Sequence, residues 1–71
     1  MPDKALKNRV YIECSDTSKR VKGTILRKEL AEMEVEMPTG FVMKLRRKNK
    51  RSPFIMRVGL LEFYSDGKEV N

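Results

Sequence analysis

Residues 32–51, EMEVEMPTGFVMKLRRKNKR, are typical of a β-hairpin that leads directly into a strongly basic segment. Residues 33–37 alternate apolar and charged side chains, and residues 41–46 do the same except at Val42. Alternation with a period of two is typical of a strand with one face in water. The tripeptide PTG lies between the two runs. Proline sets φ for a turn, and Gly40 can adopt the positive φ that ends a three-residue loop.

A three-residue loop also fixes how the two strands pair. Counting back from the loop gives the opposed residues Met37–Phe41, Val35–Met43, Met33–Leu45, Glu34–Lys44 and Glu32–Arg46. One face of the hairpin is then apolar, and the other carries two opposite-charge pairs, each worth about 0.2–1 kcal/mol. A slip of one residue would turn glutamates toward the core. The pattern and the turn therefore predict the same register.

A helix is the alternative for the first half of this stretch. The apolar residues at positions 26, 30, 33 and 37 follow a helical spacing, and residues 27–32 are good helix formers. The turn and the matched partner strand favour a strand over residues 33–37. For residues 27–31, the sequence also allows a short helical turn.

The rest of the chain adds further short strands. Residues 9–14, 20–27 and 54–58 have strand-like alternation, whereas residues 60–64 fit either a strand or a short helix. Gly23 inside a strand predicts a bulge or a tight bend. We predict an all-β fold, as a small five-stranded barrel or a strongly curled antiparallel sheet.

Length and composition limit the protein to one small domain. The 71 residues are 39% hydrophobic and predict a single domain over residues 1–71, with residues 1–8 flexible. The sequence has no apolar run long enough to span a membrane and no signal-peptide core. Cys14 is the only cysteine and histidine is absent, so we expect no disulfide, no metal, no cofactor and a cytoplasmic location.

The positive charge is concentrated in one segment. Seven of the sixteen basic residues and none of the ten acidic residues fall within residues 44–57, which leaves nine positive and ten negative groups elsewhere. A local cluster of this kind is typical of a surface that binds phosphate groups. The candidate nucleic-acid-binding cations are Lys44, Arg46, Arg47, Lys48, Lys50, Arg51 and Arg57. Lys44 and Arg46 are expected to face glutamates, so the other loop cations, which have no expected partner, are the leading candidates.

The aromatic residues divide into two groups. Phe41, Phe54 and Phe63 fall on the apolar faces of their strands and are expected in the core. Tyr11 and Tyr64 lie opposite the apolar faces, where exposed rings could stack on bases. These two tyrosines complete the predicted nucleic-acid-binding set.

Part of the chain resembles a known kind of barrel. The segment GTIL at residues 23–26, Met33, the segment VEM at residues 35–37 and Gly40 are similar to the core strands of translation initiation factor 1 and other S1-type OB-folds. The resemblance implies a five-stranded barrel that binds RNA through one sheet face and its loops. An Sm-like or SH3-like barrel accounts better for the strand expected at residues 9–14.

The sequence therefore predicts a small nucleic-acid-binding protein that contacts RNA or DNA phosphates through the basic loop at residues 44–51. The alternative is an interaction module that docks an acidic protein partner through the same loop. Pairing of exposed strand edges between copies would give a homo-oligomer. No constellation of residues indicates an enzyme, and no membrane partner is expected.

Overall fold

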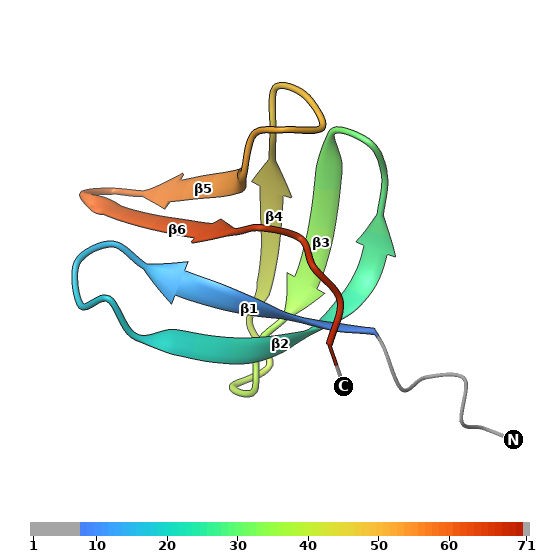
Figure 1. The fold of residues 1–71 in the computed structure, drawn as a ribbon. Coiled ribbons are helices and arrows are strands. Elements are labelled where there is room, and N and C mark those ends of the chain that lie inside the picture. The colour runs from blue at the N-terminus through green and yellow to red at the C-terminus, as the bar shows by residue number, and fades with distance from the viewer. Residues whose placement is uncertain (1–7, 71) are drawn as a thin grey trace, which may run out of the picture.

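The computed structural model describes residues 8–70, which form a closed antiparallel barrel of six strands (Figure 1). The strands are β1 (Arg9–Cys14), β2 (Arg20–Lys28), β3 (Glu32–Glu36), β4 (Val42–Arg46), β5 (Phe54–Val58) and β6 (Leu61–Ser65). Each strand pairs with the next in sequence, and β6 returns to β1. The all-β barrel is confirmed, with six strands instead of five. The expectation of flexibility at residues 1–8 falls, apart from Asn8, outside the described residues.

The sixth strand is β6, in the segment for which the sequence allowed either a strand or a short helix. Gly59 has a φ of 60° and forms a tight two-residue turn with Leu60, so that Val58 pairs directly with Leu61. Residues 27–31 form no helical turn, because β2 continues to Lys28 and Glu29 donates its backbone N–H to the Glu32 carbonyl at 2.7 Å.

The β3–β4 hairpin has the register that the sequence predicts. Glu32 lies opposite Arg46, Glu34 opposite Lys44 and Val35 opposite Met43. Met37 donates its backbone N–H to the Phe41 carbonyl at 2.8 Å, which closes the three-residue loop. Gly40 supplies the positive φ, 95°, that this loop requires.

The predicted distortion of β2 is present but lies further along the strand. The register shifts between Ile25 and Arg27, not at Gly23. Gly23 instead allows a close approach of two strands, because a Cβ at this position would overlap the Val35 side chain and lie 3.1 Å from the Met37 sulfur. The glycine therefore serves packing between β2 and β3.

This close approach predicts that Gly23→Ala destabilises the barrel. We expect the free energy of unfolding to fall by about 1–3 kcal/mol, the usual cost of overpacking. Urea unfolding measures the loss. Combining the change with Val35→Ala should give a smaller loss than the sum of the two single changes, because the overlapping methyl is removed. Simple additivity would contradict the steric explanation.

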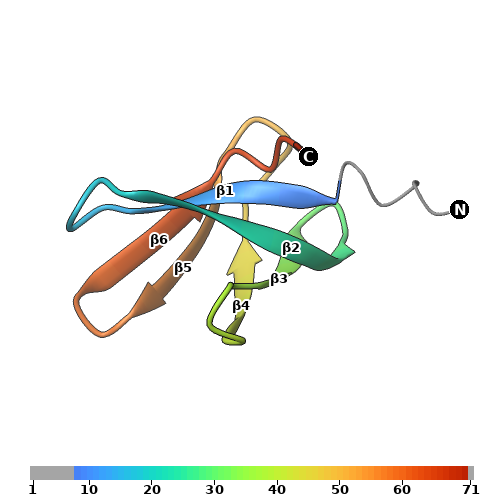
Figure 2. The ribbon, with the colours of Figure 1, turned by 90° about the horizontal axis from the view of Figure 1, so that it is seen from below.

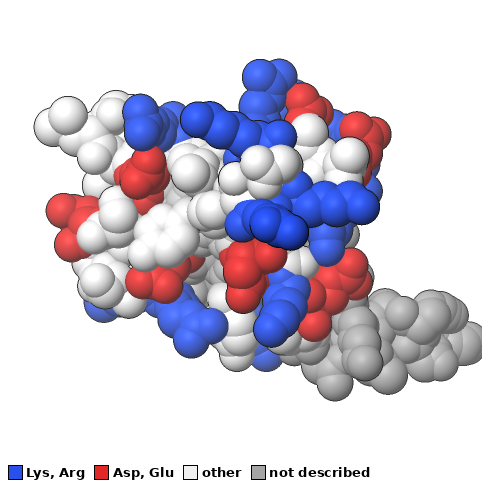
Figure 3. All heavy atoms as spheres, turned by 45° about the horizontal axis from the view of Figure 1, so that its top comes forward, with Lys and Arg blue, Asp and Glu red and all other residues white. Residues whose placement is uncertain are grey.

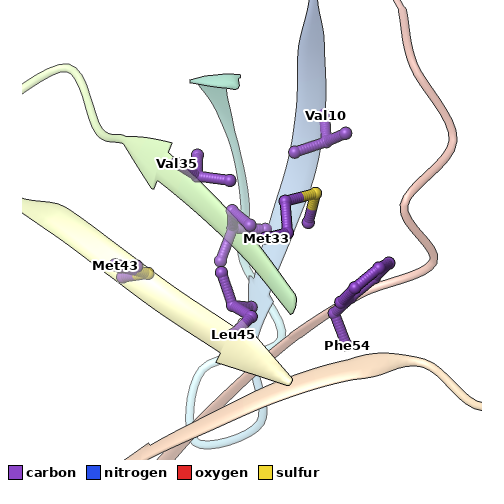
Figure 4. Packing of buried hydrophobic residues seen from close by; sticks show 7 residues of the cluster. Val10, Met33, Val35, Met43, Leu45 and Phe54 are labelled. Carbon is purple, nitrogen blue, oxygen red and sulfur yellow. The ribbon is translucent and has the colours of Figure 1, made fainter. Parts of the chain in front are cut away.

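The core fills the inside of the barrel (Figure 4). Its buried residues are Val10, Ile12, Met33, Val35, Met43, Leu45 and Phe54. Phe63 is partly buried and packs against them, as expected for an apolar-face aromatic. The core assignment of Phe41 is wrong, since its side chain is 54% exposed. Phe41 lies between the three-residue loop and the first residue of β4, Val42.

Two of the strand-to-strand joins are short. β4 pairs with β5 only at Arg46 and Ile55, and β6 pairs with β1 at two positions. Beyond the Arg46–Ile55 pair, the β5–β6 hairpin runs away from β4 in both views (Figures 1 and 2). The ends of the described chain are also fastened together, because Arg9 and Val70 exchange backbone hydrogen bonds of 3.2 and 2.7 Å.

Candidate functional site

An open groove of about 720 Å³ lies where the end of β4 meets the basic loop and β5. Its lining residues are Arg46, Arg47, Lys48, Ser52, Pro53, Ile55 and Arg57. Four of the seven predicted cations therefore lie around one depression, and no lining residue is acidic. Arg57 is among them, although it lies in β5 and not in the basic loop.

The two strand-borne cations are fixed by the sheet. Arg46 lies opposite Ile55, and Arg57 follows two residues later on the same outward face of β5. Among the described residues, each arginine has one carboxylate partner, Glu32 at 3.1 Å from Arg46 and Glu62 at 3.0 Å from Arg57. Their side chains stay 80% and 77% exposed. Such exposed ion pairs are weak, so both arginines remain accessible to another anion.

Arg47 is a structural residue as well as a cation. Its Nε donates to the Leu30 carbonyl at 2.6 Å, and its backbone N–H donates to the Ala31 carbonyl at 2.9 Å. Its guanidinium also lies over the Phe54 ring, 4.3 Å from the centroid. Among the described residues Arg47 thus has no carboxylate partner, but uncharged groups that the sequence did not predict hold its side chain. These neutral partners leave its positive charge in place while they hold the start of the loop against the barrel.

The tip of the basic loop is shaped by one asparagine. The Asn49 side-chain oxygen accepts hydrogen bonds from the backbone N–H groups of Arg51 and Ser52, at 2.9 and 3.1 Å. Lys50 and Arg51 are exposed on this tip and do not line the groove. Within residues 8–70, no carboxylate lies within 4.0 Å of Lys48, Lys50 or Arg51.

Lys44 keeps its predicted position but not its predicted ion pair. It lies opposite Glu34 in the ladder, yet the Glu34 carboxylate is bound by Arg27 at 3.1 Å. Arg27 also contacts Glu29 at 2.6 Å and Glu32 at 3.3 Å, and these three carboxylates, with Glu29 first, raise the pKa of Arg27. Among the described residues, Lys44 is thus left without a carboxylate partner, outside the groove.

The two predicted tyrosines lie together in a second, smaller depression of about 360 Å³. It is lined by Tyr11, Glu13, Arg20, Pro53, Tyr64, Ser65 and Asp66. Pro53 lines both depressions, so the tyrosines adjoin the basic groove.

The register explains this arrangement. Arg46 lies opposite Ile55, Ile55 opposite Tyr64, Tyr64 opposite Glu13, and Glu13 opposite Arg20. One row of outward side chains therefore crosses five strands, since residues directly opposite in antiparallel strands share a face.

The tyrosines differ in how they are held. The Tyr64 hydroxyl donates to the Glu13 carboxylate at 3.0 Å, and this hydrogen bond raises the pKa of Tyr64. Tyr11 is 36% exposed, and its ring lies beneath two cations, Arg20 at 4.5 Å and Lys22 at 5.6 Å from the centroid.

Arg20 and Lys22 were missed by the sequence analysis. They fall outside the basic segment, and only the pairing of β1 with β2 brings them beside the tyrosines. The sequence did carry a signal for them. Side chains alternate between the two faces of a strand, so Arg20 and Lys22 share the face that does not carry Gly23. The acidic residues near Tyr64 were also missed. Figure 3, in which the top of Figure 1 is turned forward, shows Asp and Glu side chains scattered between Lys and Arg side chains on that face.

Two features are absent from residues 8–70. No helix there is long and apolar enough to cross a membrane. No group of three or more acidic, cysteine or histidine side chains in the same range could hold a metal ion.

Comparison of the chain with protein-family models, curated proteins and solved structures finds no match.

Proposed function

We propose that this barrel binds nucleic acid across the face formed by the basic groove and the tyrosine depression. The observation that carries the proposal is the groove itself, which brings together Arg46, Arg47, Lys48 and Arg57 without a lining carboxylate. Cations gathered along a groove displace the counterions of a phosphate backbone, and this release drives binding. The exposed loop cations Lys50 and Arg51 extend the same positive surface.

The neighbouring tyrosines support a role for bases as well as phosphates. A basic groove beside exposed aromatic rings is the usual arrangement of proteins that bind single strands. Exposed Tyr11 and half-buried Tyr64 adjoin the groove at Pro53, and Ile55 contributes an apolar surface between the cations. The resemblance to OB-folds or to SH3-like barrels adds only a fold analogy, which is a weak warrant for function. The six strands also exceed the five of an OB-fold.

Binding is measured by fluorescence anisotropy with short labelled single- and double-stranded RNA and DNA at several salt concentrations. We expect log K to fall linearly with log salt, with a slope of about 3 to 5 from the unpaired and weakly paired cations. An absence of binding even at low salt would overturn the proposal. The same loop would then be assigned to an acidic protein partner.

Lys48→Gln is the sharpest single substitution, because Lys48 lines the groove and has no carboxylate partner among the described residues. We expect weaker binding to all sequences and a salt slope smaller by about 1. Lys19→Gln is the control, since it removes the same charge from a loop that lines neither depression. Equal effects of the two changes would mean that net charge, and not the groove, governs binding. Arg47 is unsuited to this test because it also holds the fold.

A further inference from the structure

The outer edge of β4 presents backbone groups that nothing in the described chain pairs. Met37 donates its backbone N–H to the Phe41 carbonyl, which identifies 37–41 as a hydrogen-bonded pair. Such pairs alternate along an antiparallel ladder, so Met43 and Leu45 also point their backbone groups at β3. The backbone groups of Val42 and Lys44 must then point the other way, toward β5.

β5 does not meet them. Within residues 8–70, the ladder between β4 and β5 consists of Arg46 and Ile55 alone. Continuing the same register would set Lys44 opposite Arg57 and Val42 opposite Gly59. Like charges directly opposite each other destabilise a strand pair. The strands diverge instead, and Val42 and Lys44 remain an open edge in an otherwise closed barrel.

The side chains beside this edge define what it can accept. Val42 is 41% exposed, and Phe41 next to it is 54% exposed. Lys44 has no carboxylate partner among the described residues, and Arg57 occupies the β5 position that a continued register would set opposite Lys44. An incoming strand would therefore meet cations on its outward face and apolar side chains at its end. On the other edge of β4 the ladder places Glu34 opposite Lys44, but Arg27 binds the Glu34 carboxylate, so the Lys44 charge is not matched there.

We propose that this edge accepts an extended acidic segment of a partner protein by strand addition. Main-chain hydrogen bonds to Val42 and Lys44 supply affinity, and an acidic side chain opposite Lys44 supplies specificity. Charge complementarity favours this occupant over a second copy of the chain. In a dimer formed by two β4 edges paired about their centre, Lys44 would lie opposite Lys44 of the second copy, and like charges directly opposite each other are destabilising. Each copy also carries a net charge of +6.

The first test is amide hydrogen exchange with a capped eight-residue peptide of alternating Glu and Val. In the free protein, the Val42 and Lys44 amides are expected to exchange quickly, and those of Met43 and Leu45 slowly. Adding the peptide should slow exchange at Val42 and Lys44. Peptide-induced changes confined to the basic loop would overturn the proposal, as would no protection at the β4 edge. A capped peptide of alternating Lys and Val should give no protection.

The second test uses substitutions that separate backbone from charge. Val42→Pro deletes an outward N–H and leaves the β3 ladder intact, a position that edge strands tolerate. We expect at least a tenfold loss of peptide affinity, with the fold checked by circular dichroism. Lys48→Gln is the matched control and should bind the peptide normally while binding nucleic acid less well. Undiminished peptide binding by folded Val42→Pro would refute strand addition.

If Val42→Pro fails to fold, two other experiments test the same edge of β4. Lys44→Glu should lose the Glu-Val peptide and gain the Lys-Val peptide, and retention of the original preference would contradict the assigned contact. Sedimentation of the peptide-free protein should show a monomer. A concentration-dependent dimer that Lys44→Glu alters would assign the edge to a second copy instead.

Discussion

Phe54→Ala is expected to lower the free energy of unfolding by about 3–5 kcal/mol, the usual loss when a buried phenylalanine is truncated. The Phe54 side chain is fully buried in the core and also lies beneath the Arg47 guanidinium. A core of this size rarely supplies more than about 3–5 kcal/mol of stability. A large part of the variant should therefore be unfolded at room temperature without denaturant.

Urea unfolding followed by far-ultraviolet circular dichroism measures this loss. Phe41→Ala is the matched control, because it removes the same atoms from a side chain that is 54% exposed. Its effect should stay within about 0.5 kcal/mol, as for most surface substitutions. Comparable losses in the two variants would contradict the assignment of Phe54 to the core and Phe41 to the surface.

Gly67→Ala is expected to cost about 2–4 kcal/mol, from a strained backbone together with overpacking. Gly67 has a φ of 75°, and a Cβ there would lie 2.7 Å from an edge carbon of the Phe54 ring. Its backbone is also fixed on both sides, because its N–H donates to the Ser65 hydroxyl at 3.0 Å and its carbonyl accepts from Lys28 at 2.8 Å. Neither the segment nor the ring can move away easily.

Gly59→Ala separates the two contributions. Gly59 has a similar φ of 60°, but nothing lies within 4 Å of the position that an alanine Cβ would occupy there. Its loss should be about 1–2 kcal/mol, the backbone contribution alone. Combining Gly67→Ala with Phe54→Leu should show favourable coupling between the two sites, because the smaller side chain vacates the space. Equal losses at the two glycines would mean that contact with the ring is unimportant.

The β3–β4 hairpin was predictable from sequence because every local signal agreed. The alternation required one face to be buried, the PTG loop allowed only one register, and opposite charges matched across the strands. The same signals predicted Arg46 beside Glu32, and the structure contains that ion pair. Local patterns of this kind are informative because they are resolved within about fifteen residues of chain.

What the sequence could not predict depends on strands that are distant in the chain. Arg47 is held by Leu30 and by Phe54, and neither contact follows from alternation. The β2–β3 pairing sets Arg27 opposite Glu34, and Arg27 binds the Glu34 carboxylate. Lys44 therefore does not form the ion pair with Glu34 that the hairpin register suggested. The bulge lies beyond Gly23 because β2 must bend where it passes from β1 to β3. In each case, tertiary packing selected among partners that the local pattern allowed equally.

The short joins on either side of the β5–β6 hairpin have a consequence for local unfolding. The hairpin is joined to β4 at one position and to β1 at two, whereas β1 to β4 are linked by longer ladders. A unit fastened by so few main-chain bonds opens at a lower free energy than the whole barrel, and the core contacts of buried Phe54 and partly buried Met56 and Phe63 oppose that opening. Because Ile55 and Arg57 of the groove lie on this hairpin, any ligand that spans the groove must oppose the opening.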